Sequence, residues 1–130
     1  MNKATKANLQ RASTYIDRVQ MHEGIPLFSH IDINPTELCN RRCVFCPSAD
    51  PNKYPNQTLN LSFRLAEKMS DGLEALRYQG VVVLCGFGEP LLHPDLVTIV
   101  SCFSETIRIE IVTNGDDLTP SLIQRFIETG

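Results

Sequence analysis

The 130-residue sequence lacks several features that define large classes of proteins. No apolar run approaches the roughly 20 residues that cross a bilayer, and the charged start at residues 1–9 has no apolar stretch behind it to form a signal peptide. A formal net charge of -3 provides no basic excess for nucleic acid. With 42% hydrophobic and 21% charged residues and no low-complexity tract, the chain is typical of a globular protein. We therefore expect a cytoplasmic protein of at most one domain that binds neither membranes nor nucleic acid.

Helical and strand-like patterns alternate along the rest of the chain. Leu9, Ala12, Ile16 and Val19 recur at helical spacing before Gly24. The patterns after them predict strands at 31–34, 81–84 and 107–111, each followed by a helix, at 62–80, 94–103 and 119–130.

This order predicts an α/β fold in which a parallel sheet with right-handed crossovers is flanked by helices. A complete eight-fold barrel takes about 250 residues, so three strand–helix units are fewer than half of one. We expect a helical extension at 1–26 and a truncated (β/α)3 barrel core at 27–130. A small three-stranded α/β domain is the alternative. A structureless connection as long as that at 35–61 is usually either functional or disordered, and the three cysteines in it favour a function.

Three cysteines lie in that connection with the spacing CxxxCxxC: Cys39, Cys43 and Cys46. A reducing compartment favours a metal site over disulfides. A [4Fe–4S] cluster takes one thiolate per iron, so three thiolates leave one iron open for a further ligand. The alternatives are three unrelated thiols, or a structural zinc site, which needs four ligands and would have to add Cys85 or His93.

The segment from Thr36 through the three cysteines to Pro47 resembles the cluster motif of the radical S-adenosylmethionine (radical SAM) superfamily. That resemblance implies that Cys39, Cys43 and Cys46 hold a [4Fe–4S] cluster. It also implies that S-adenosyl-L-methionine chelates the open iron, and that Phe45 lies near the adenine. The fold it implies is a partial TIM-type (β/α)6 barrel, of which this chain would be the N-terminal portion.

Two further motifs follow the second and third predicted strands. Gly86-Phe87-Gly88-Glu89-Pro90 could be a tight connection, or a place where the backbone approaches a ligand and a carboxylate accepts from an ammonium group. It resembles the GGEP motif of the superfamily, with Phe87 at the second glycine, which implies that Gly86, Gly88, Glu89 and Pro90 contact the methionyl group of the cofactor. Thr113-Asn114-Gly115 is either a capped turn or, by resemblance, a TNG motif that places Thr113 and Asn114 beside the cofactor.

Polar residues alternate with isoleucines in the first and third predicted strands: Asp32, Asn34, Arg108 and Glu110. If the isoleucines face the outer helices, these polar residues face the interior. Because barrel interiors are normally apolar, they indicate either a substrate cavity or two partly solvated strands. Cys85 and Cys102 are expected to be core thiols, and His93 to serve a turn or cap.

The resemblance implies a radical SAM enzyme without an assigned catalytic side chain. Its reduced cluster would cleave S-adenosylmethionine to methionine and a 5′-deoxyadenosyl radical, which takes hydrogen from a peptide or a sugar-derived small molecule. It further implies a flavodoxin- or ferredoxin-type electron donor, and membership of a branch that often bears C-terminal SPASM or twitch clusters. The isolated 130-residue chain is expected to bind its cluster weakly and to lack turnover. A non-catalytic iron–sulfur electron carrier and a zinc-stabilised interaction module are the alternatives.

Overall fold

A computed structural model of the chain describes residue 6 and residues 19–103 and 107–129. The predicted N-terminal helix falls almost entirely outside these residues. Where that helix was expected to end, the chain forms a small antiparallel hairpin of β1 (Met21–His22) and β2 (Ile25–Pro26). Glu23 and Gly24 make its turn with positive φ angles of 50° and 82°, and no periodic pattern in the sequence had indicated it.

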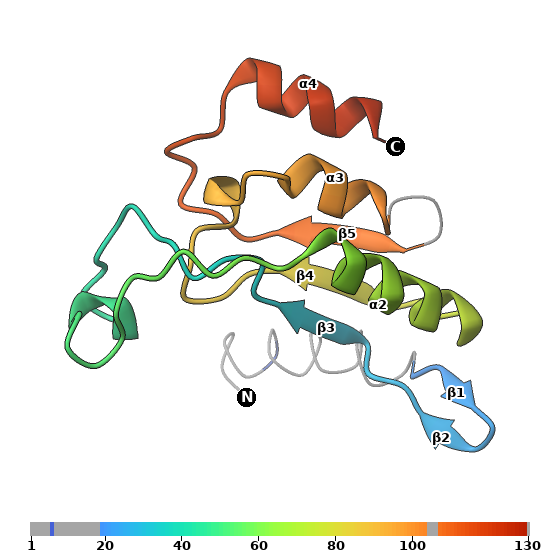
Figure 1. Cartoon of the computed structure of the whole chain (residues 1–130). Coiled ribbons are helices and arrows are strands. Elements are labelled where there is room, and N and C mark those ends of the chain that lie inside the picture. The colour runs from blue at the N-terminus through green and yellow to red at the C-terminus, as the bar shows by residue number, and fades with distance from the viewer. Residues whose placement is uncertain (1–5, 7–18, 104–106, 130) are drawn as a thin grey trace.

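The central sheet has three parallel strands in the order β3-β4-β5. They span His30–Ile33, Val81–Leu84 and Arg108–Ile111. Ile33 pairs with Leu84, which in turn pairs with Ile111, so the three strands end level with one another. The predicted parallel α/β sheet is confirmed. Figure 1 shows the long loop that follows β3 leaving from this common carboxyl edge.

Three helices follow the three strands: α2 (Phe63–Ala75), α3 (Leu96–Ser101) and α4 (Pro120–Glu128). They lie in a row with α3 in the middle (Figure 1), where α3 contacts both α2 and α4. One hydrogen bond ties the first pair, because the Ser70 hydroxyl of α2 donates to the carbonyl of Cys102 directly after α3, at 2.6 Å. None of the helices in the described residues is long and apolar enough to cross a membrane.

The hydrophobic core lies between the sheet and these helices. Val82 and Leu84 of β4 are fully buried there, together with Ala66 of α2 and Ile99 of α3. The isoleucines of β3 and β5 pack on the same cluster. The alternation in these two strands therefore does separate an apolar helix-facing side from a polar side, as the sequence predicted.

The predicted caps at the starts of α2 and α4 are confirmed, whereas the predicted end of α2 is not. The Ser62 and Thr119 hydroxyls each accept from the backbone N–H three residues on, at 3.3 and 3.2 Å. The prediction that α2 continues to Gly80 is wrong. The helix ends at Ala75, and Arg77 turns the chain with a φ of 49°.

The predicted buried face of α4 is only half formed. Leu122 and Phe126 are half-buried, but Ile123 and Ile127 are 43% and 67% exposed. The apolar stripe is wider than the surface that α3 offers to it, so one side of α4 has no cover within the described residues. The predicted cap at Gly130 lies outside them.

Candidate cofactor site

Glu89 joins two of the three predicted motifs at the carboxyl edge of the sheet. Glu89 is buried, with only 3% of the residue exposed. One oxygen, Oε1, accepts from the Thr113 hydroxyl at 2.5 Å and from the Leu91 N–H at 3.0 Å, and Oε2 accepts from the Asn114 N–H at 2.8 Å. The segment after β4 and the turn after β5 are thus held together by one buried carboxylate. Its predicted contact with the cofactor's amino group stays a prediction.

The same segment also lies directly against the chain that leads from β3 to the cysteines. The Glu89 N–H donates to the Leu38 carbonyl at 2.7 Å. A Cβ atom on Gly88 would lie 1.7 Å from the Thr36 carbonyl oxygen, and one on Gly86 would lie 2.3 Å from the Asn34 side chain. Both glycines are therefore required by close approach of protein to protein, whatever they also contribute to a ligand.

The cysteine loop is folded on itself rather than structureless. The backbone N–H of Cys39 donates to Asn56 at 2.8 Å, and the Asn56 amide donates back to the Cys39 carbonyl at 3.2 Å. A short 3₁₀ turn at Pro47–Ala49 follows Cys46 directly, and the N–H of Cys46 donates to the Cys43 carbonyl at 2.9 Å. These bonds fix both ends of the cysteine run.

The three thiols are free and half-buried, and three thiolates are one fewer than a structural zinc ion takes. Within the described residues, no three His, Cys, Asp or Glu side chains are grouped so as to hold a metal ion, the three thiols included, so their assembly round a cluster stays a prediction. His93, considered as a fourth zinc ligand, is 4% exposed, and its ring nitrogens contact the Leu61 carbonyl at 2.9 Å and the Asp95 N–H at 3.0 Å. A [4Fe–4S] cluster takes one thiolate for each iron, and free thiols on one loop suit it.

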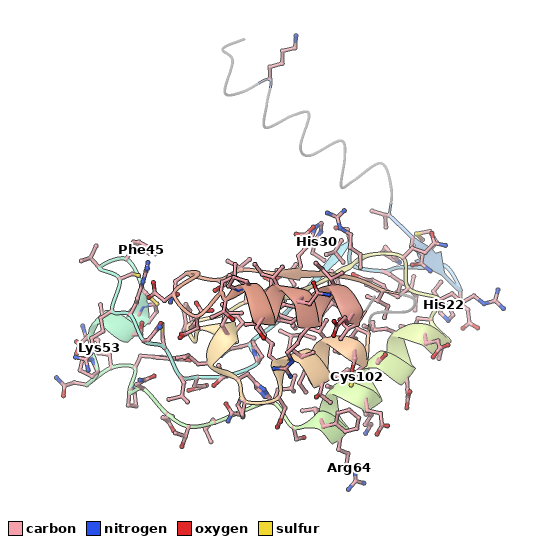
Figure 2. All side chains as sticks on the ribbon, turned by 90° about the horizontal axis from the view of Figure 1, so that it is seen from above. His22, His30, Phe45, Lys53, Arg64 and Cys102 are labelled. Carbon is pink, nitrogen blue, oxygen red and sulfur yellow. The ribbon has the colours of Figure 1, made fainter. Side chains whose placement is uncertain are left out.

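Phe45, which directly precedes Cys46, points away from the protein surface into solvent. It is 88% exposed, and its neighbour Val44 is 95% exposed. Figure 2 shows Phe45 at the outer end of the cysteine loop. The ring is therefore open to contact, but the structure does not bring it to Glu89 or Asn114, and its place beside an adenine stays a prediction.

Two residues inside the cysteine run bind the turn after β5, which sequence reasoning missed. The Arg41 guanidinium donates to both carboxylate oxygens of Asp116, from Nε at 2.7 Å. Asn40 donates to Asp117 at 3.0 Å and accepts from the Asn114 amide at 2.8 Å. The hydrogen bond between Arg41 and Asp116, together with their charges, raises the pKa of Arg41 and lowers that of Asp116.

A second missed contact involves Phe87, which stands where the family motif typically has glycine. Its ring meets the Tyr54 ring edge-on, with centroids 5.3 Å apart and an angle of 75°. Burial, followed by the charge of Glu37, raises the pKa of Tyr54. The larger side chain thus contacts the far part of the cysteine loop, and its departure from the motif is accommodated.

The polar face of the sheet gives no support to a substrate contact by Arg108. This residue begins β5 at the amino edge, roughly 10 Å along the strand from the carboxyl end, and its guanidinium pairs with Glu110 at 2.7 Å. Cys85 lies nearer to the motifs, and burial together with the charge of Asp32 raises its pKa. Cys85 and Cys102 are both half-buried rather than fully enclosed core thiols.

These features define a class: a parallel α/β barrel segment in which one loop of free thiols is locked at the carboxyl edge against two further loops. A sequence model of the Radical SAM superfamily matches residues 33–130. The chain therefore belongs to the radical SAM superfamily. Membership implies a [4Fe–4S] cluster and S-adenosylmethionine as its cofactors.

Individual relatives agree with this assignment. The chain is 33% identical over 107 residues to the S-adenosyl-L-methionine-dependent 2-deoxy-scyllo-inosamine dehydrogenase of Niallia circulans, covering 80% of this chain and 42% of the relative. It is 32% identical over 95 residues to a GTP 3′,8-cyclase of Campylobacter jejuni, covering 67% and 28%. The chain thus spans less than half the length of either relative.

Solved structures support the fold and the cofactor. BtrN in complex with AdoMet and 2-DOIA superposes with a TM-score of 0.72 at 32% identity, over 80% of this chain and 43% of that one. An open conformation of BtrN gives a TM-score of 0.67. The protein in the first of these structures holds S-adenosylmethionine on the same fold.

Proposed function

We propose that this chain forms the cluster-binding part of a radical SAM enzyme. The observation that carries the proposal is the junction at Glu89, which joins the segment after β4 to the turn after β5 by its carboxylate and to the cysteine loop by its N–H. When bound, a reduced [4Fe–4S] cluster would supply the electron for cleavage of S-adenosylmethionine to a 5′-deoxyadenosyl radical.

Residues at different positions of the chain would serve different parts of this function. Cys39, Cys43 and Cys46 would hold three irons and leave the fourth to the cofactor. Gly86 and Gly88 let the segment after β4 lie close to the chain between β3 and the cysteines. Glu89 holds the turn at Asn114 by a hydrogen bond. Orientation of the bound cofactor is therefore what this part of the protein provides.

We further propose a small, hydroxyl-rich molecule as the substrate. The names of the two relatives specify 2-deoxy-scyllo-inosamine and GTP, both small polar molecules, which favours a sugar-derived substrate over a peptide. Residues that select it would lie in the parts of the relatives that this chain does not span. A flavodoxin- or ferredoxin-type donor in the cytoplasm would deliver the electron.

The test is anaerobic reconstitution of the chain with iron and sulfide, reduction, and EPR with and without S-adenosylmethionine. A cluster signal that changes when the cofactor is added supports the proposal. An unchanged signal would favour an electron carrier, and a colourless, redox-silent protein would favour a zinc module. Cys39→Ala should abolish the signal, and Cys85→Ala is the matched control that should keep it. Robust deoxyadenosine production by the isolated chain would contradict the expectation that it lacks turnover.

A further inference from the structure

We propose that Asn40 and Arg41 are positioning residues for the cluster loop. With Asn114, Asp116 and Asp117 they form what we term the loop latch, which orders the loop before any metal binds and sets how firmly the cluster is retained. The second half of this inference rests on the proposed function, and the first half does not.

The loop latch joins positions 74 to 77 residues apart in the sequence. Asn40 uses both ends of its amide, because Oδ1 accepts from Asn114 at 2.8 Å and Nδ2 donates to Asp117 at 3.0 Å. Arg41 binds both oxygens of Asp116. A bidentate arginine–carboxylate pair fixes direction as well as distance, so two adjacent residues of the loop are held against one turn.

The turn that receives them is itself fixed. The Asn114 N–H donates to the buried carboxylate of Glu89 at 2.8 Å, and its side-chain oxygen accepts from the Asp116 N–H at 2.9 Å. An unbroken path of hydrogen bonds thus runs from Glu89 through Asn114 to Asn40, the residue next to Cys39. The latch therefore sets Cys39 at a defined place relative to the junction of the three motifs.

Hydrogen bonds matter for the order of the cysteine loop because burial of its apolar side chains stabilises it little. Val44 and Phe45 are 95% and 88% exposed, so hydrophobic contact does not hold the middle of the cysteine run. Each ordered residue loses about 1 to 2 kcal/mol of backbone entropy. Polar contacts at Asn40, Arg41 and Asn56, together with the Cys46–Cys43 backbone bond, oppose that loss.

A rival explanation is that Arg41 acts through its charge, by stabilising thiolates or a reduced cluster. The two explanations predict opposite patterns. If the charge of Arg41 is what matters, Arg41→Gln and Asp116→Asn change the net charge in opposite directions. The rate of iron release then shifts in opposite directions in the two variants, and the double variant releases iron like the wild type. If the latch is what matters, either substitution breaks the same contact, and the double variant is no worse than the single ones.

The first measurement is hydrogen exchange of the metal-free chain at residues 39–46. We expect Arg41→Gln, Asp116→Asn and the double variant each to exchange about threefold faster, as suits an exposed but bidentate pair. Arg42→Gln is the matched control. It removes the same charge one residue away, and among the described residues the Arg42 side chain forms no hydrogen bond or ion pair. Unchanged exchange in the Arg41 variant, or equal acceleration in the Arg42 variant, would overturn the latch.

The second measurement is iron release from the reconstituted protein to a chelator. The three latch variants should release iron about threefold faster than the wild type and the Arg42→Gln control. Opposite shifts in the two single variants would establish the charge explanation and refute positioning. If no variant binds a cluster, the exchange experiment still decides whether the latch exists, so failure of the latch and failure of the proposed function are distinguishable.

Discussion

Gly88 offers the sharpest test of how closely the cofactor-motif segment approaches the cysteine loop. In Gly88→Ala the new Cβ would lie 1.7 Å from the Thr36 carbonyl oxygen, 2.7 Å from the Thr36 carbonyl carbon and 3.0 Å from the Leu38 carbonyl oxygen. All three are backbone atoms, which cannot turn aside as a side chain can. The two segments must separate, and the 2.7 Å bond from the Glu89 N–H to Leu38 breaks with them.

The expected loss follows from these contacts. Inserting a methyl group into a packed site costs about 1 to 3 kcal/mol, and a lost internal hydrogen bond adds about 1 kcal/mol. For a chain of this size each kcal/mol lowers the melting temperature by about 4 °C. Gly88→Ala should therefore melt about 10 °C below the wild type in a thermal scan followed by circular dichroism.

Gly72→Ala is the matched control, because it adds the same methyl group where nothing lies within 4 Å. Gly72 is inside α2, where alanine is favoured over glycine by about 0.5 to 1 kcal/mol. This variant should melt slightly above the wild type. Equal melting temperatures for Gly88→Ala and the wild type would show that the two segments are farther apart than described.

Three further predictions concern the surroundings of this junction and the core. In Glu89→Gln the new side-chain NH2 group faces a backbone N–H of Leu91 or Asn114, so two donors meet. The free energy of unfolding measured in urea should therefore fall by about 1 to 3 kcal/mol. Phe87→Ala removes the edge contact with Tyr54 and should cost about 0.5 to 1.5 kcal/mol in the same assay, with no loss refuting the contact. Burial raises the pKa of Tyr78 above its ordinary value of 10.0, so the folded chain holds that proton more tightly than the unfolded chain. Stability should therefore fall as the pH rises from about 10 through the folded pKa, less steeply in Tyr78→Phe.

The sheet and the order of its elements could be predicted because their signals are local. Val81–Leu84 is a run of apolar residues that suits a strand covered on both sides, and the isoleucines of β5 alternate with polar residues. Ser62 and Thr119 indicate helix starts because their side chains cap the first turn. Each of these patterns is contained within about ten residues, and the strand or helix start that each predicts is confirmed.

Other features depended on partners far along the chain and could not be predicted. Nothing near Arg41 indicates that it pairs with Asp116, which lies 75 residues later. The exposed side of α4 could not be predicted for the same reason. Periodicity shows that Ile123 and Ile127 share a face with Leu122, but it does not show how much of that face α3 covers. Local spacing predicts which residues lie on one face, whereas only the packed structure shows what covers that face.

The role of Glu89 shows why a motif can be recognised without its structural reason being visible. A carboxylate beside glycines suggests an acceptor for a ligand's ammonium group, yet the sequence gives no sign of how deeply it is buried. At 3% exposure an acidic side chain needs donors from the protein itself, and Thr113 and Asn114 supply them. The glutamate of one motif and the threonine and asparagine of the next are therefore mutually dependent. A substitution at Thr113 should consequently affect the segment after β4 before it affects any ligand.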